Sequence, residues 1–373
     1  MTPRTPKILT LVGTRPELIR LSRTIPLFDG LFTHVLVHTG QNADPRLKDL
    51  FLDELGIRAP DHYLDVPVTS PAAMLADLFV KTEALLAREQ PDAMVILGDT
   101  NSALACIVAR KQGVPVYHLE AGHRCFDRES PEEANRRIID HTCDINVAYT
   151  EAARRNLLHE GLHPRRTYVL GSPLGEVIAH YRSRIDASGV LGTLGLTPGR
   201  YLTASLHRQE TVDDPARLAG LLAALQAAHT ETGWPVILST HPRIRRRIDE
   251  GAGKQAPGVR FSPPFGFFDW CALQQHAACV ISDSGTVSEE AALLGFAAIT
   301  PRQSMERPEA MDCGRVILCG IAPDDVLNAL RLALKTPPGP DAGVPPEYRV
   351  TDYSRRLAAL VGGTCRLVRD WKF

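Results

Sequence analysis

The sequence lacks any long apolar run and any excess of charge of one sign. Its longest apolar stretches, such as residues 93–97 and 291–300, are interrupted well short of the roughly 20 residues that span a bilayer. Lys and Arg number 42 against 43 Asp and Glu, so no overall positive field attracts nucleic acid or an anionic membrane. We therefore expect neither a membrane nor a nucleic acid as partner, and any bound anion must be held by local groups.

Cysteine pairs and the common cofactor fingerprints are also missing. The eight cysteines never form a C-x-x-C pair and lie mostly inside apolar runs, which favours buried thiols over a zinc site or a disulfide scaffold. Neither G-x-G-x-x-G nor G-x-x-x-x-G-K-[ST] occurs, which argues against a dinucleotide or Walker-type triphosphate site. These missing patterns lead us to expect neither a metal nor a cofactor. Residues 1–8 show no long apolar stretch with a small-residue cleavage site, so we expect a cytoplasmic protein.

The sequence does contain a repeated alternation of short apolar runs with helical periodicity. Its 373 residues, 44% of them apolar, suffice for two or three domains with substantial cores. Alternating strands and helices predict parallel sheets covered on both faces. The predicted strands are residues 8–12, 34–38, 93–97, 115–119, 145–148 and 167–170, followed by 201–205, 236–239, 259–261, 279–282, 297–300 and 316–319.

This pattern predicts an α/β fold of two Rossmann-like, doubly wound domains facing a cleft. The rhythm loosens at residues 184–200, which we interpret as a linker. We place the first domain at residues 1–180 and the second at 181–350, and we expect the helical stretch 351–373 to return to the first. The carboxyl ends of the strands would then face the cleft, which is the usual ligand site of such folds.

Charged residues follow several strands of the first domain. Arg15 opens a helix after Gly13 and is a phosphate candidate, because the free N–H groups of a first helical turn favour an anion. A well-capped helix with a solvated arginine is the alternative. Asp99 and Glu120 each follow a predicted strand, and Asp99 could instead cap the next helix.

A third acid, Glu132, lies four residues before Arg136 on a predicted helix, so the two share a face. An ordinary surface salt bridge is the alternative for this pair. If Asp99, Glu120 and Glu132 meet in one cleft, they could carry out general acid/base chemistry.

Two turns that join a histidine to a basic residue follow neighbouring strands of the second domain, at His207 and His241. Further along, Ser284 and Gly285 lie in a turn between a strand and a helix, which suits a phosphate group. We expect these four residues to bind or act on a phosphorylated ligand.

Acidic and aromatic residues complete the second set of candidates. Glu289 fits a capping box, which leaves Glu290 as the acid for a ribose. The aromatic cluster with Phe265 and Phe267 could cover a flat base, or simply pack in the core. Arg307 adds a cation near the expected cleft.

Seven short motifs occur in order along nearly the whole chain. They are GTRPE (13–17), GDT (98–100), EAG (120–122), PEEANR (131–136), HR (207–208), SDSG (282–285) and ERPE (306–309). Together they resemble the non-hydrolysing UDP-N-acetylglucosamine 2-epimerase family. The resemblance implies two Rossmann-like domains facing a cleft, as in GT-B glycosyltransferases, with a UDP-sugar substrate, no metal, no nicotinamide and a homodimer.

The resemblance also distributes the candidate residues over a UDP-sugar. The residues it implies for the diphosphate are Arg15, His207, Ser284 and Arg307, with Glu290 for the ribose and Phe265 to Phe267 for the uracil. The residues it implies around the sugar are Asp99, Glu120, Glu132 and Arg136. Asp99 and Glu120 would act near C2, Glu132 would assist, and Arg136 would position Glu132.

Two departures from the common form of the family bear on the substrate. Arg20 replaces the lysine usual five positions after the arginine of GTRPE, which keeps the charge and changes its reach. The loop at residues 38–47 differs, so we expect no activation by UDP-N-acetylglucosamine. Residues 38–42 and 124–146 are similar to the UDP-N-acetyl-L-fucosamine synthases, which epimerise C2 of a 6-deoxy sugar for cell-surface polysaccharides.

Other functions stay open at this point. A GT-B glycosyltransferase would share the fold and the UDP contacts but would need an acceptor. A hydrolysing 2-epimerase would release free sugar and UDP, and a sensor would bind without turnover.

Overall fold

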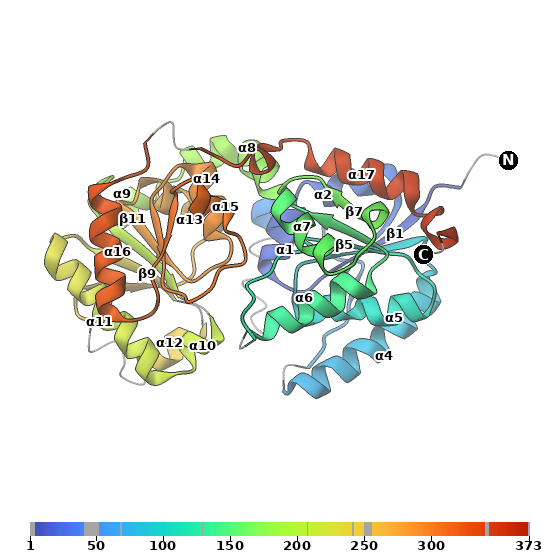
Figure 1. Ribbon diagram of the computed structural model, residues 1–373, viewed down its shortest axis with the longest axis horizontal. Coiled ribbons are helices and arrows are strands. Elements are labelled where there is room, and N and C mark those ends of the chain that lie inside the picture. The colour runs from blue at the N-terminus through green and yellow to red at the C-terminus, as the bar shows by residue number, and fades with distance from the viewer. Residues whose placement is uncertain are drawn as a thin grey trace. The chain divides into compact units, whose positions relative to one another are not determined.

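Two compact units, each built around a parallel sheet, make up the computed structural model shown in Figure 1. The structure describes residues 4–40, 52–67, 69–128, 130–206, 208–240, 242–249, 256–339 and 343–371. The first unit consists of residues 1–179 and 346–373, and the second of residues 180–345.

The first unit contains a seven-stranded sheet with the order β3-β2-β1-β4-β5-β6-β7. Its strands are β1 (Lys7–Val12), β2 (Thr33–His38), β3 (His62–Tyr63), β4 (Ala93–Leu97), β5 (Val116–Leu119), β6 (Ile145–Ala148) and β7 (Thr167–Val169). Every residue of β4 is buried, as expected for a parallel strand with helices on both faces.

Helices cover both faces of this sheet. They are α1 (Arg15–Leu21), α2 (Thr24–Leu31), α4 (Pro71–Glu89), α5 (Cys106–Lys111), α6 (Pro131–Thr142), α7 (Glu151–His159) and α17 (Tyr353–Thr364), with a short 3-10 helix at Asn101–Ala105. Their starts follow local rules: α4 begins with Pro71, and the Ser70 hydroxyl accepts a hydrogen bond from the Ala73 N–H at 3.1 Å. Helix α8 (Pro173–Asp186) begins in the first unit and ends in the second.

The second unit contains a six-stranded sheet with the order β10-β9-β8-β11-β12-β13. Its strands are β8 (Leu202–Leu206), β9 (Val236–Thr240), β10 (Val259–Ser262), β11 (Cys279–Ser282), β12 (Ala298–Thr300) and β13 (Val316–Leu318). Its helices are α9 (Val190–Leu194), α10 (Gln209–Val212), α11 (Pro215–Thr232), α12 (Pro242–Asp249), α13 (Phe267–His276), α14 (Val287–Leu294), α15 (Glu309–Asp312) and α16 (Pro323–Lys335).

The last helix, α17, lies beside α2, although the two helices are near opposite ends of the sequence (Figure 1). Its residues Leu357 and Val361 are fully buried. The hydroxyls of Tyr117 and Thr364 are 2.6 Å apart, which joins α17 to β5. The C-terminal segment is therefore part of the first unit.

The predicted α/β class with two doubly wound sheets is confirmed, and every predicted strand is present within a residue or two. The two-residue strand β3 was not predicted. The stretch 184–200, interpreted from the sequence as a linker, instead includes the end of α8 and all of α9.

Candidate active site

In the first unit, the carboxyl ends of neighbouring strands bring the two predicted acids to one edge of the sheet. Strands β4 and β5 are paired in parallel with Leu97 opposite Leu119, so Asp99 and Glu120 follow the two strands at nearly the same level. Tyr149 follows β6, the next strand in the sheet. Adjacent strands lie about 5 Å apart. These three side chains therefore start close together.

Glu120 is held by side chains from two other elements and by an unusual backbone. Its φ of 71° lies in the left-handed region, which few residues other than glycine adopt. Its carboxylate lies 3.6 Å from the guanidinium of the buried Arg20 and accepts a hydrogen bond from the Tyr149 hydroxyl at 3.2 Å. The Arg20 guanidinium also lies over the Tyr149 ring. Arg20 and Tyr149 therefore fix the position of the Glu120 carboxylate.

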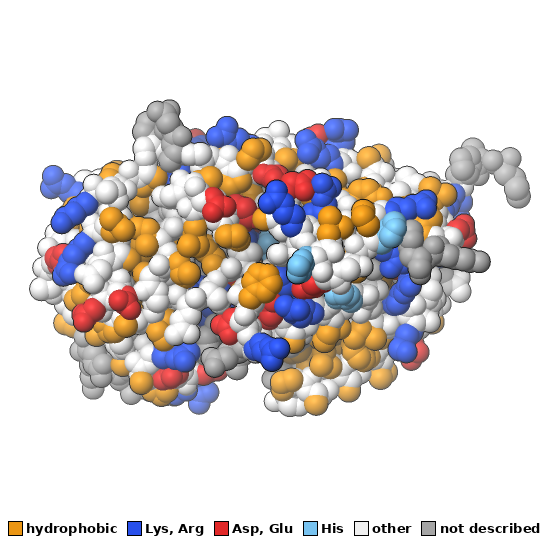
Figure 2. Space-filling view, viewed as in Figure 1, with side chains coloured by type: hydrophobic (Ala, Val, Ile, Leu, Met, Phe, Trp, Pro, Cys, Tyr) orange, Lys and Arg blue, Asp and Glu red, His pale blue; other side chains and the backbone are white. Residues whose placement is uncertain are grey.

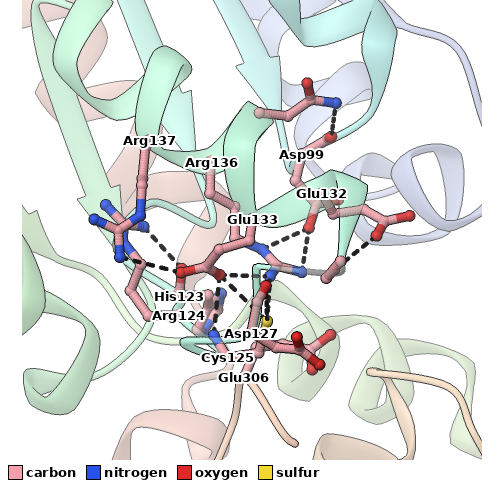
Figure 3. A network of polar contacts seen from close by, with 12 residues as sticks. Asp99, His123, Arg124, Cys125, Asp127, Glu132, Glu133, Arg136, Arg137 and Glu306 are labelled. Atoms are coloured by element: carbon pink, nitrogen blue, oxygen red, sulfur yellow. Dashed lines mark hydrogen bonds and ion pairs between the residues drawn. The ribbon is translucent and has the colours of Figure 1, made fainter.

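Asp99 is held by Arg136, as Figure 3 shows. The Nε and Nη2 atoms of Arg136 lie 2.8 and 2.7 Å from one carboxylate oxygen of Asp99. The Nη1 atom of the same guanidinium donates to Glu133 at 3.1 Å. Burial alone would raise the pKa of Glu133, but hydrogen bonds from Cys125 and Arg136 hold it below its usual value. Arg136 thus bridges the buried Glu133 and the partly exposed Asp99.

The predicted partnership of Glu132 with Arg136 is wrong. Glu132 accepts a hydrogen bond from the hydroxyl of Ser130 at 2.9 Å, at the start of α6. Glu133, three residues before Arg136, occupies the buried face instead. Helical spacing favours i,i+3 and i,i+4 pairs equally, so the sequence contained a signal for Glu133 as well, and Glu132 was the wrong choice of the two.

The turn after β1 is held by a carboxylate of the helix that follows it. The backbone N–H groups of Gly13 and Thr14 donate to the carboxylate of the buried Glu17, at 2.5 and 3.2 Å. The Thr100 hydroxyl donates to the other oxygen of Glu17 at 3.0 Å. These two N–H groups are therefore occupied by the protein's own carboxylate. Arg15 is half-buried and keeps its place on the first turn of α1 as the group that could meet a phosphate.

In the second unit, a cluster of arginines surrounds the turn between β11 and α14. Arg307 donates to the carbonyl of Gly285 at 2.7 Å and pairs with the buried Glu289 at 2.8 Å. Glu289 is therefore the partner of Arg307, a role that the capping-box prediction missed. A Cβ atom on Gly285 would lie 2.8 Å from an oxygen of Glu306, so the close packing at this turn favours glycine.

Two more arginines, Arg208 and Arg302, join this cluster through Glu306. The Arg208 guanidinium lies 2.8 Å from one oxygen of Glu306, and Arg302 donates to the other at 2.5 Å. The Arg208 Nε–H also donates to the carbonyl of Asp283 at 3.0 Å, just before Ser284. This concentration of cations beside a Ser/Gly turn suits an anionic ligand.

The remaining candidates of the second unit fall into three situations. Glu290 accepts a hydrogen bond from the buried Gln274 at 2.7 Å. Phe267 is buried against Phe268 and Tyr181, the packing that we gave as the alternative to base contact, while Phe265 is half-buried and stacks on Trp270. His207 and His241 lie outside the residues that the structure describes, as do residues 41–47 of the loop that we single out as different.

Of the eight free cysteines, six are buried, and Cys313 and Cys319 are partly exposed. Over the described ranges, no group of three or more His, Cys, Asp and Glu is placed to hold a metal ion. Among the described helices, none is long and apolar enough to span a bilayer.

Comparison with known proteins first defines a class and then a family. Structural neighbours share the two parallel α/β sheets and place the chain in the expected GT-B-like class. A family model described as UDP-N-acetylglucosamine 2-epimerase matches residues 29–360. The chain belongs to this family, which confirms the predicted isomerase assignment.

Three relatives illustrate the match. The solved structure of a UDP-N-acetylglucosamine 2-epimerase from Rickettsia bellii is 38% identical, with a TM-score of 0.90 over 98% of both chains. The Methanocaldococcus jannaschii UDP-GlcNAc 2-epimerase, solved with UDP-GlcNAc and UDP, is 29% identical, with a TM-score of 0.89 over 95% of this chain and 99% of that one. A Pseudomonas aeruginosa UDP-2,3-diacetamido-2,3-dideoxy-D-glucuronate 2-epimerase is 33% identical over 88% of this chain and 92% of its own.

Proposed function

We propose that this chain is a non-hydrolysing UDP-N-acetylhexosamine 2-epimerase that inverts C2 by eliminating UDP and adding it back. The observation that carries the proposal is the pair of acids at adjacent strand ends, with Arg136 on Asp99 and Arg20 beside Glu120. Family membership and the UDP-GlcNAc and UDP bound in the Methanocaldococcus relative support a UDP-sugar as substrate.

The chemistry explains why two acids and several cations are needed. A C2–H bond beside an acetamido group is not acidic, so direct deprotonation at neutral pH is slow. If the C1–O bond breaks as the C2 proton leaves, UDP departs with the bonding electrons and a C1=C2 double bond forms. Protonation of C2 from the opposite face and return of UDP to C1 then give the epimer. Cations stabilise the departing diphosphate, and carboxylates move the protons.

Each candidate residue has a role in this scheme. Asp99 and Glu120 exchange protons at C2, and Arg136 positions Asp99 rather than Glu132. Glu132, which bonds to Ser130, assists from the start of α6. His207 is a fourth catalytic candidate, which also meets the diphosphate. Arg20 binds the substrate from beside Glu120, and Phe267 contributes its backbone because its ring is buried. The other groups proposed to hold the nucleotide and the diphosphate are Arg15, His241, Phe265, Ser284, Gly285, Glu290 and Arg307.

One incubation tests the proposal. The wild-type protein is mixed with UDP-N-acetylhexosamines in D2O and followed by proton NMR. We expect deuterium at C2 of substrate and product, with no accumulation of free sugar. Retention of the C2 proton during turnover would contradict elimination. Release of free N-acetylmannosamine and UDP would identify a hydrolysing enzyme, and release of UDP only with an added acceptor would identify a glycosyltransferase.

A paired variant separates chemistry from binding. Glu120→Gln keeps the size of the side chain and its acceptor oxygen but removes the group that carries the proton. We expect turnover to fall roughly 10²–10⁴-fold, the usual contribution of a general acid or base, with UDP affinity unchanged by calorimetry. Glu151→Gln, at an exposed glutamate on α7, is the matched control.

We further propose that the preferred substrate is a 6-deoxy UDP-N-acetylhexosamine used for a cell-surface polysaccharide. The similarity of residues 38–42 and 124–146 to the fucosamine branch and the presence of Arg20 support this choice. A pocket that faces a methyl group at C6 needs no hydrogen-bond partner there, whereas a C6 hydroxyl left unpaired would cost about 1–3 kcal/mol. Saturation curves on UDP-2-acetamido-2,6-dideoxy-L-talose and on UDP-N-acetylglucosamine check this, and a higher kcat/KM on the second would contradict it.

We also propose that the chain forms a homodimer through α4. The face of this helix that points away from its sheet is mostly small and apolar, and Figure 2 shows apolar side chains gathered in the area that α4 occupies in Figure 1. An exposed, mostly apolar helix face is a candidate contact surface for a second protein chain.

A further inference from the structure

A buried chain of alternating charges lies directly behind the loops that carry Asp99 and Glu120. His118, the penultimate residue of β5, lies 2.8 Å from Asp140 of α6 through its Nδ1 atom. Asp140 in turn accepts a hydrogen bond from the Nη1 atom of Arg124 at 2.7 Å. The same guanidinium donates to both oxygens of Glu160, at 2.8 and 2.6 Å. His118, Asp140 and Arg124 are all almost completely buried.

This chain of charges is attached to the backbone on either side of the two acids. The Nε2 atom of His118 lies 2.9 Å from the carbonyl oxygen of Gly98, which precedes Asp99. The second oxygen of Asp140 accepts the N–H of Gly122, two residues after Glu120, at 3.2 Å. One histidine–aspartate pair therefore fixes the peptide groups that determine where Asp99 and Glu120 start.

The backbone at these points is left-handed, with φ values of 77° at Gly98, 71° at Glu120 and 82° at Gly122. Glycine adopts this region freely, so the strain lies at Glu120. A glutamate in the left-handed region persists only when the surrounding structure holds it there. A Cβ atom on Gly122 would lie 2.3 Å from the carbonyl oxygen of Ala153, so this part of the loop cannot shift towards α7.

Both atoms that face the His118 ring are acceptors. A carbonyl oxygen cannot donate, and Asp140 cannot do so while it is ionised. Burial alone would raise the pKa of Asp140, but hydrogen bonds from His118 and Arg124, together with the positive charge of Arg124, hold it below its usual value. Each ring nitrogen of His118 must then carry a proton. The charged groups around this ring are Asp140 from α6, Arg124 from the loop after β5, and Glu160 behind Arg124.

We propose that His118 is held as an imidazolium between Asp140 and the Gly98 carbonyl, and that this pair positions Asp99 and Glu120 for proton transfer. The second half of the statement rests on the proposed 2-epimerase function. Neither residue is assigned a contact with substrate, so both are positioning residues. They act by fixing the separation of the two carboxylates.

The first experiment measures the protonation state of the wild-type ring directly. Histidines are labelled with ¹⁵N, and nitrogen NMR is recorded at about pH 8, where an ordinary exposed histidine is neutral. We expect one of the 13 histidines to carry protons on both nitrogens. Its signal should disappear in His118→Gln and shift to that of a neutral ring in Asp140→Asn, so either variant assigns it. A neutral His118 in the wild-type protein would overturn the proposal, whether or not the protein turns over.

The second experiment compares two buried aspartates that flank the same strand. Asp140→Asn removes the charge that faces His118. Asp144→Asn is the matched control, because Asp144 is also buried and accepts the N–H of Val116 at 3.0 Å, at the opposite end of β5 from Glu120. Asp144 also pairs with Arg110 on the surface.

The two roles give different kinetic results. If His118 and Asp140 position the acids, Asp140→Asn lowers kcat at least 10-fold and changes KM and UDP affinity less than about 3-fold. Asp144→Asn retains the wild-type kcat, even if its melting temperature falls as much as that of Asp140→Asn. Equal kcat values in the two variants would overturn the positioning role. Absence of any 2-epimerase turnover in the wild type would instead refute the proposed function, and the NMR result would still decide the state of His118.

Discussion

At the scale of single residues, two of the four left-handed positions among the described non-glycine residues lie in the segment between β5 and α6. They are Glu120 and Phe126, with φ values of 71° and 56°, while the other two, Asp65 and Gln90, lie elsewhere in the first unit. The ring of Phe126 is 71% exposed, so packing does not compensate for its backbone. Strain of this kind costs about 1–3 kcal/mol per residue and clusters at functional sites. Sequence analysis identified Glu120 as a candidate site residue, but no sequence pattern indicated its left-handed conformation.

A second residue-scale feature, the buried Glu17, leads to a prediction about pH. Burial raises its pKa from 4.5 to about 7, against smaller opposing effects of the Gly13 and Thr14 N–H groups and the Thr100 hydroxyl. Because the folded state holds the proton more tightly than the unfolded state, the favourable contribution is complete below about pH 4.5 and is lost as the pH rises to about 7. We expect the stability of wild type relative to Glu17→Gln to fall by about 2–4 kcal/mol over this range.

Urea unfolding of both proteins at a series of pH values checks this prediction. Subtracting the Glu17→Gln values removes the contributions of the other carboxylates, including Asp140 and Glu133, whose lowered pKa values act in the opposite direction. Glu151→Gln, at a glutamate of α7 whose side chain is 46% exposed, makes the same change away from the core and is the control. A constant difference between wild type and Glu17→Gln from about pH 4 to 8 would show that folding leaves the pKa of Glu17 unchanged, which would contradict this prediction.

At the scale of elements, α6 shows why side-chain partners are harder to predict than helices. The start of the helix at Pro131 follows from the sequence. Three of its four buried residues, Glu133, Arg136 and Asp140, are charged, and the fourth is Ile139. Which of Glu132 and Glu133 turns inward depends on how α6 is rotated against the sheet. Helical spacing alone does not determine that rotation.

The C-terminal helix provides an element-scale prediction. Leu357 of α17 is fully buried in the first unit, while Leu367, beyond the end of the helix, is 54% exposed. Leu357→Ala should lower the free energy of unfolding by about 2–5 kcal/mol, because it removes transfer energy and leaves a cavity. Leu367→Ala is the matched control, with an expected change below about 0.5 kcal/mol. Chemical denaturation measures both, and equal effects would mean that α17 does not pack on the unit as described.

At the scale of the whole molecule, the fold was far more predictable than the contacts within it. Buried parallel strands are continuous apolar runs, so the strands of both sheets stood out in the sequence. The two-residue strand β3 did not, because one pair of residues has no pattern. Contacts such as Arg20 with Glu120 join residues 100 positions apart in the sequence. The strand order that brings them together becomes visible only in three dimensions.

At the same scale, the exposed face of α4 predicts that the molecule self-associates. The exposed residues of this helix include Ala72, Ala76, Val80, Ala84 and Ala87, which recur at helical spacing, and Val80 is 66% exposed. The opposite face, with Met74, Leu78 and Leu85, is already buried against the first unit. Small side chains let two helices approach closely, so a second copy of this surface is a suitable partner.

Val80→Glu should therefore dissociate the dimer, because a carboxylate at the contact would be buried without a partner. Sedimentation equilibrium of the wild type should give twice the 40.9 kDa mass of the chain, and of Val80→Glu the single mass. Leu332→Glu introduces the same charge at an apolar position of α16 that is 51% exposed, and it should leave the dimer intact. A wild type that sediments as a monomer would refute the dimer. A dimer that survives Val80→Glu would place the interface elsewhere, because a C2 contact brings the same patch of both chains together and would bury this charge twice.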